Sequence, residues 1–298
     1  MPDCDFLLEL RLKQLNRDLA YRQTCCMSLF EQMLQKILRA FPTFTDHTLL
    51  HSLSVTNLAN QMLGREVEKL NAEEIYILLM AAALHDVGMA VSDRDFEQFL
   101  RAQGQGKYSG EYSEAEKMDL IRSLHNEFSA AFVKKYWEIF DIPGERYAAA
   151  IAEVCRGHRK TDLFNEDEYP VDYDLEDGGK RVNLALLAAV VRLADELDVA
   201  SDRNPELLYV EGTKGGTNAE SIREFAKHDA IRTVEFTRDT VLIAADTGDA
   251  GIAEAVEEVV EKIRETLSYC LSVVENRSAL RLGCRSVHLI LNGREEER

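Results

Sequence analysis

The sequence predicts a mainly α-helical protein that ends in a small α+β appendage, and three observations support this fold class. Apolar residues recur at helical spacing through roughly the first two thirds of the chain. After about residue 205 the pattern changes, and two short segments typical of strands flank a turn. At 298 residues, 46% of them apolar, the chain can bury a full-sized core. We therefore expect a helical domain over 1–204, with 1–42 as its N-terminal helical extension, and an appendage over 205–298.

The helices of the first domain follow from apolar spacing and from the breaks between periodic segments. A helical segment is expected over 5–40, and Pro42 closes it. Further helices are expected over 46–64, 72–88, 115–140, 145–160 and 181–200. Two polar stretches, 101–116 and 161–179, interrupt this pattern. Loops of this length in a compact domain are either lids or disordered.

The appendage has a hairpin signature followed by a helix and a third strand. Residues 233–237 and 240–244 are rich in β-branched and apolar residues and lie on either side of a turn at Arg238-Asp239, which predicts two strands. An amphipathic helix is expected over 251–275, and the apolar segment 286–291 forms the last strand. These elements predict a small unit in which one helix covers a sheet.

Charge and cysteine usage exclude several classes of partner and site. The net charge of −18 opposes attraction to a phosphate backbone, so long nucleic acid is not expected as a partner. A small phosphate ester is still compatible, because a bound divalent metal can dominate the field inside one cleft. The six cysteines show no CxxC spacing, which argues against a zinc ribbon or a disulfide framework.

Targeting and membrane signals are not apparent in the sequence. The N-terminal residues are acidic where a signal peptide would be cationic and then apolar. The longest apolar run, 75–84, is about half of the roughly 20 residues that a membrane span requires. We therefore expect a cytoplasmic protein with no membrane segment and a buried helix at 75–84.

Histidines concentrate in the predicted helical domain. Of seven histidines, five precede residue 160: His47, His51, His85, His125 and His158. His47 and His51 are four residues apart and share a helix face. His85 and Asp86 end an apolar helix that should be buried on all sides. Taken singly, His47, His125 and His158 could each be a hydrogen-bonded core residue, so their interpretation depends on what surrounds them.

Asp195 is the most informative carboxylate, because it continues a core stripe. Leu184, Ala188, Val191 and Asp195 follow at intervals of four, three and four residues, which places them on one helix face. Burying an ionised carboxylate there costs several kcal/mol unless a cation or hydrogen bonds compensate it. A metal ion would do so, although Asp198 could take the same role instead.

A mixed imidazole and carboxylate set favours a divalent transition metal such as Mn, Fe, Zn or Ni. These residues are compatible with one ion or two. In the second case, the Asp86 carboxylate could bridge the two ions, with an activated water between the ions. The predicted reaction class is hydrolysis, with the catalytic role assigned to Asp86. The basic run at 156–160 could be an ordinary solvated helix end or could bind phosphate through Arg159 and Lys160.

The order His51, His85-Asp86, Asp195 resembles the H…HD…D pattern of the HD superfamily of metal-dependent phosphohydrolases. The strings HSLSV, LLMAAALHDVGM and VVRLADELDV are similar to its ligand helices, and the resemblance spans roughly residues 40 to 200. It implies an HD-type helical bundle in which His51, His85, Asp86 and Asp195 bind the first metal. It also implies that His125 and His158 bind the second ion in two-metal members.

The subfamily is narrowed by further residues. HDVGM lacks the Lys that cyclic-di-GMP phosphodiesterases of the HD-GYP type carry, which argues against that activity. The segment SIREFAKHDAIRTVEF is similar to HD-CE modules, which occur beside Hsp90-like ATPase or nucleotide-signalling domains. Such a resemblance implies an ATPase or signalling module as partner, and the sequence leaves open whether the chain forms a homo-oligomer.

Three functional hypotheses follow. In the first, the protein hydrolyses a nucleotide or related phosphate ester, and the phosphates are bound by His47, Arg159, Lys160 and Arg203. In the second, it binds metal and nucleotide as a sensor without turnover. In the third, it is a purely structural helical scaffold, which an absence of bound metal would support.

Overall fold

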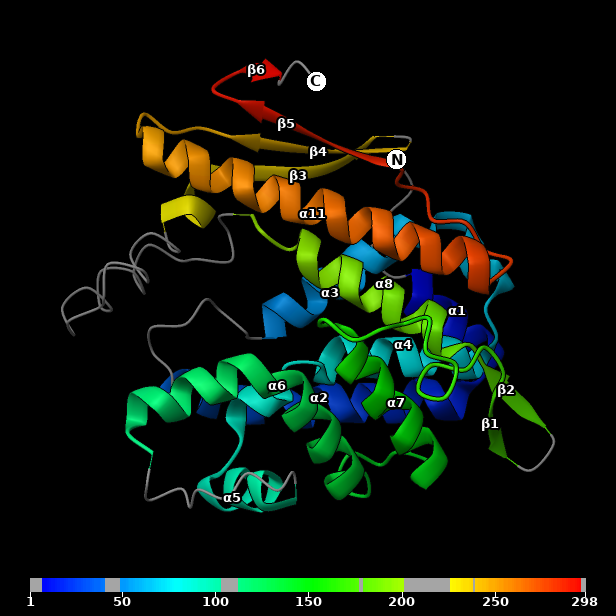
Figure 1. The fold of residues 1–298 in the computed structure, drawn as a ribbon. Helices are drawn as coiled ribbons and strands as arrows, with labels where there is room; N and C mark the ends of the chain where they lie inside the picture. Colours follow the sequence, from blue (N-terminus) through cyan, green and yellow to red (C-terminus); the bar gives the residue numbers. More distant parts are fainter. Residues whose placement is uncertain are drawn as a thin grey trace.

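The structure is a computed structural model that describes residues 7–40, 49–102, 112–176, 179–200, 226–237 and 239–295. It confirms the expected fold class, a mainly α-helical protein with a small sheet near its C-terminal end (Figure 1). None of the helices within these ranges is long and apolar enough to cross a membrane.

The bundle is built from eight α-helices, with two 3₁₀ turns among the described residues. The α-helices are α1 (Leu7–Leu15), α2 (Arg17–Ala40), α3 (Leu49–Leu63), α4 (Ala72–Leu84), α5 (Asp93–Ala102), α6 (Glu114–Tyr136), α7 (Glu145–Gly157) and α8 (Leu184–Leu197). The 3₁₀ turns are η1 (Gly64–Lys69) and η2 (Val87–Ala90). The helix expected over 5–40 is divided at Asn16, whose side chain accepts the main-chain N–H groups of Asp18 and Leu19 and so begins α2.

Helix α4 forms the centre of the bundle. Every residue from Ile75 to Leu84 is buried, and α1, α2, α3, α7 and α8 pack around it. A capping box between Asn71 and Glu74 fixes its start. The helix expected over 72–88 ends at Leu84, and the chain turns into η2. His85 and Asp86 therefore lie at a junction between two elements, inside the core.

The C-terminal elements form a four-stranded sheet and one long helix. The strands are β3 (Ile231–Thr237), β4 (Thr240–Ala245), β5 (Ser286–Leu291) and β6 (Arg294–Glu295), in that order across the sheet. Strands β4 and β5 are parallel, and α11 (Ala250–Arg277) is the crossover that connects them. The other two pairs are antiparallel.

Helix α11 lies between the sheet and the bundle (Figure 1). Its buried stripe includes Val256, Val260, Ile263, Leu267 and Val274, and the helix packs on α8. Helix α8 is therefore buried on nearly all sides from Leu184 to Ala194. The division of the chain at 204/205 falls outside the described residues and stays a prediction.

The polar stretch 161–179 differs from expectation. Leu163 and Tyr169 are fully buried within it, and its end forms the hairpin of β1 (Tyr173–Glu176) with β2 (Lys180–Val182). These two apolar side chains fix the segment to the bundle, so its described part is not a disordered loop. Its role as a lid stays a prediction. Most of the other stretch, 101–116, lies outside the described residues.

Candidate metal centre

Six polar side chains from α3, α4, α6, α7 and α8 meet inside the bundle. They form two groups of three, each with ligand atoms within 4.8 Å of one another. The first triad is His51, His85 and Asp195, and the second triad is Asp86, His125 and His158. Five of the six are buried, and the Asp195 side chain is 20% exposed.

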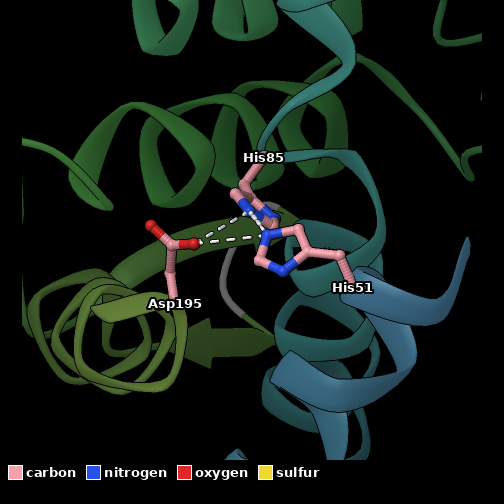
Figure 2. Close-up of side chains that lie close together, drawn as sticks. All are labelled: His51, His85 and Asp195. Atoms are coloured by element: carbon pink, nitrogen blue, oxygen red, sulfur yellow. Dashed lines mark hydrogen bonds and ion pairs between the residues drawn. The ribbon is translucent and has the colours of Figure 1, made fainter. Parts of the chain in front are cut away.

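The first triad brings together the first turn of α3, the end of α4 and the last turn of α8. His51 Nε2 lies 3.0 Å from His85 Nε2. Asp195 Oδ1 lies 3.3 Å from His51 Nε2 and 3.6 Å from His85 Nε2. Figure 2 shows the three side chains pointing toward one common point. The helix face on which the sequence places Asp195 therefore points toward the two histidines.

The second triad lies beside the first, and Asp86 faces both. His125 Nε2 and His158 Nε2 are 2.9 Å apart, and Asp86 Oδ1 lies 3.3 Å from the first and 3.7 Å from the second. The other carboxylate oxygen, Oδ2, lies 3.5 Å from His51 Nε2 and 3.4 Å from His85 Nε2. One carboxylate thus presents one oxygen to each pair of histidines.

Main-chain carbonyls orient three of the four imidazoles. In each case Nδ1 lies within hydrogen-bond distance of the carbonyl oxygen three residues earlier: His85 to Ala82 at 3.0 Å, His125 to Arg122 at 2.7 Å and His158 to Cys155 at 2.5 Å. A carbonyl only accepts, so these contacts assign the proton to Nδ1. Nε2 of His125 and of His158 is left with its lone pair directed into the cluster, and so is Nε2 of His85 when that ring is neutral.

A carboxylate orients the fourth imidazole. His51 Nδ1 lies 2.5 Å from Asp198 Oδ2, and Ser54 Oγ donates to Asp198 Oδ1 at 2.6 Å. Asp198 is therefore on the opposite side of the His51 ring from the cluster. Of the two carboxylates that the sequence left open, Asp195 faces the histidine pair and Asp198 supports one of its members.

The electrostatics differ between the two triads. Burial lowers the pKa of His158 well below its ordinary value, and the neighbouring His85 and His125 add to this effect. Burial also lowers the pKa of His125, more than the Asp86 charge raises it. Both imidazoles of the second triad are therefore neutral near pH 7.

In the first triad, the charges outweigh burial. Burial opposes the charged form of His85, but Asp86 and Asp195 raise its pKa well above the ordinary value. Burial likewise opposes the charged form of Asp195, but hydrogen bonds from His51 and His85 hold its pKa well below the usual range. This half of the cluster thus favours a cation beside an ionised carboxylate.

Two glycines allow the supporting elements to approach closely. A Cβ on Gly88 would lie 2.3 Å from the carbonyl oxygen of His125 and 2.4 Å from the main-chain nitrogen of Ser129. A Cβ on Gly157 would lie 2.5 Å from the Cβ of Ala188. The first close approach brings η2, and with it Asp86, against α6, and the second brings the end of α7 against α8.

Comparison with known protein families identifies the family to which this chain belongs. The HD-CE family model matches residues 41–278, which is most of the chain and includes every residue of both triads. The chain belongs to the HD-CE family. No curated protein matches it. The clustered His and Asp side chains of this HD-CE domain can bind a metal ion, as expected for an HD-type site. The match also extends beyond residue 205 to include α11.

The predicted phosphate-binding residues of this HD-CE protein are only partly described. Arg159 and Lys160 are exposed and follow His158 directly. Burial is the main cause of the lowered pKa of His125, and the positive charge of Arg159 is a further cause. His47 and Arg203 lie outside the described residues.

Sequence reasoning did not find the supporting roles around the HD-CE cluster: Ser54 was missed, and Asp198 was considered only as a replacement for Asp195. Ser54 and Asp198 support His51. Arg192 was treated only as part of a ligand helix, yet it is buried and binds the main chain at the end of α7. A charged residue on the core side of an apolar helix is the signal that could have identified Arg192.

Proposed function

We propose that this HD-CE protein is a metal-dependent phosphohydrolase that hydrolyses a nucleotide or a related phosphate ester. The observation that carries the proposal is the 2.9 Å distance between His125 Nε2 and His158 Nε2. Both rings donate from Nδ1 to a carbonyl, so two lone pairs face each other. Two acceptors at this distance repel unless a cation lies between them.

A proton does not meet this requirement, because burial lowers the pKa of both imidazoles. A metal ion fits better. Ligand atoms at right angles around one six-coordinate ion, with bonds of about 2.1 Å, lie about 3 Å apart. The nitrogen pairs of the two triads, at 3.0 and 2.9 Å, have this spacing. The donor set supports Mn, Fe, Ni or Zn in preference to Mg or Ca.

The residues of the two triads would bind different ions. A pair of such ions, when bound, lowers the pKa of a coordinated water and polarises a phosphoryl oxygen. His51, His85 and Asp195 would hold one ion, and His125 and His158 the other. Asp86, with one oxygen toward each histidine pair, would bridge them and fix their separation. Asp195 has the most exposed side chain of the six, so substrate would approach from its side.

Phosphate recognition is proposed for the basic residues beside the second triad. Arg159 and Lys160 are exposed directly after His158, in a chain whose net charge of −18 otherwise repels anions. Two cationic side chains directly after a histidine of the second triad suit a role in neutralising phosphates. His47 and Arg203 are proposed as additional phosphate ligands on the sequence alone.

A second candidate is a sensor that binds metal and nucleotide without turnover. The packing of α11 on α8 favours it, because Lys262 of α11 pairs with Glu196, the residue after Asp195, at 2.8 Å. A ligand bound at the cluster could thereby alter the surface that a second copy or a partner ATPase or signalling module would contact. Turnover separates the two candidates.

The test is a hydrolysis screen of Mn-loaded protein over dNTPs, NTPs, cyclic nucleotides, ppGpp and generic phosphodiesters. The wild-type protein should release product from at least one class, Asp86→Ala should not, and Asp119→Ala, an exposed carboxylate on α6, should match the wild type. If no compound is hydrolysed but nucleotides raise the melting temperature, the sensor function replaces the hydrolase.

A further inference from the structure

Arg192 is a buried cation in α8, only 9% exposed. Among the described residues it forms no ion pair with a carboxylate; its guanidinium donates to main-chain and hydroxyl oxygens instead. Burying a charge without a counter-ion is costly, so its hydrogen bonds must hold something that the fold needs.

The hydrogen bonds of Arg192 bracket one short turn. Arg192 Nε donates to the carbonyl of Gly157 at 2.8 Å, and Nη2 donates to Thr161 at 2.8 Å on the carbonyl and 3.0 Å on the hydroxyl. The three residues between these anchors, 158–160, contain a histidine of the second triad and both exposed basic residues. A single guanidinium therefore fixes both ends of this turn.

Helix α11 supports the same arrangement from the other side. The Arg192 guanidinium lies 5.1 Å above the ring of Tyr269, within cation–π distance. The Tyr269 hydroxyl accepts the main-chain N–H of Leu163 at 2.7 Å, two residues beyond the anchor at Thr161. Arg192 and Tyr269 together connect α8, α11 and the segment that follows α7.

We propose that Arg192, supported by Tyr269, is a positioning residue for the turn 158–160. Arg192 would direct His158 Nε2 toward the other two residues of the second triad, and it would place Arg159 at the edge of that triad. Through Tyr269, the second metal position would also depend on α11. The planar fork of arginine is required, because a lysine ammonium cannot span both carbonyls in one fixed geometry. This inference rests on the proposed function in one respect: His158 must hold a metal ion.

The test is a calorimetric titration of the metal-free full chain with Mn²⁺, which reads metal affinity without any substrate. Residues that orient metal ligands typically contribute a factor of about 10 to 100 in affinity. Arg192→Lys should weaken the second ion by about this factor and leave the first ion unchanged. Tyr269→Phe and Thr161→Val, which are milder, should weaken the second ion by a smaller factor.

The matched control is Lys134→Met, which breaks an exposed ion pair between α6 and α7, the pair with Glu153 at 2.7 Å. It should leave both affinities at the wild-type values. If Arg192→Lys does not fold, Tyr269→Phe and Thr161→Val still decide the matter. Variants that lower the melting temperature but bind both ions like the wild type would overturn the proposal and leave Arg192 a structural residue.

Two further outcomes separate this inference from the proposed hydrolase. A wild-type chain that binds one ion, with none at His158, overturns the positioning role but leaves a mononuclear hydrolase intact. A wild-type chain that binds two ions, loses the second in Arg192→Lys and hydrolyses no compound supports the positioning role. That last result would contradict the hydrolase function only.

Discussion

Asp198 accepts a hydrogen bond from His51 Nδ1 at 2.5 Å, on the side of the ring opposite the metal cluster. This arrangement of carboxylate, imidazole and ligand position fixes the tautomer and the direction of Nε2. It also explains why two aspartates three residues apart are needed at the end of α8.

Asp198→Ala should weaken the ion at the first triad by about 10- to 100-fold, because His51 loses the partner that orients it. The second ion should be affected less. Ser54→Ala removes only the second hydrogen bond to the same carboxylate and should have a smaller effect. The measurement is metal affinity by titration, and wild-type affinity in Asp198→Ala would contradict the assigned role.

Gly88→Ala should destabilise the protein and displace Asp86 from the second triad. The added Cβ would meet main-chain atoms of α6 at 2.3 and 2.4 Å, which cannot yield as a side chain would. Overpacking of this kind typically costs 1 to 3 kcal/mol, so about that loss is expected in chemical denaturation. Gly179→Ala is the matched control, since no atom lies within 4 Å of its Cβ position. An equal effect of both substitutions would refute this explanation.

The double variant His125→Ala/His158→Ala should reduce the bound metal by half and leave the first triad occupied. In the wild type, the imidazoles of His125 and His158 come from different helices, and their Nε2 atoms lie 2.9 Å apart. If they contact substrate instead, the metal content will stay constant while the Michaelis constant rises. Elemental analysis together with steady-state kinetics distinguishes these results.

Glu9→Gln should stabilise the protein at neutral pH. Burial raises the pKa of Glu9 above its ordinary value, and its Oε2 atom has no hydrogen-bond partner among the described residues. The stabilising contribution of a carboxyl with a raised pKa is fully present below its unfolded pKa and is lost as pH rises through the folded pKa. The melting temperature of Glu9→Gln should therefore exceed that of the wild type by more at about pH 8 than at about pH 4. A constant difference would contradict the assigned burial.

The sequence was sufficient for most of the elements and for the order of the candidate ligands, but α5 and the hairpin of β1 and β2 were not predicted. Hydrophobic periodicity gave the main helices within a few residues, and the strand expected over 286–291 has the bounds Ser286–Leu291. Asp195 was identified because a carboxylate interrupts an apolar stripe. These signals lie within short stretches of the chain, so they can be recognised in a single sequence without related sequences.

The supporting contacts could not be predicted, because they join residues far apart in the chain. Asp198 and His51 are separated by 147 positions, and Arg192 reaches across 35 positions to Gly157. The packing of the segment 161–179 onto the bundle was not predicted, because composition alone does not show that Leu163 and Tyr169 are buried in the core. Only the packing of α7, α8 and α11 supplies that information.

The measurement that tests the central claim most directly is the metal content per chain of the wild type and Asp86→Ala by elemental analysis. Asp86 presents one oxygen to each histidine pair, so the wild type should carry up to two transition-metal ions and the folded variant should carry none. Circular dichroism should show that both proteins are equally helical. A wild type without metal, or a variant with wild-type metal content, would contradict the proposed centre.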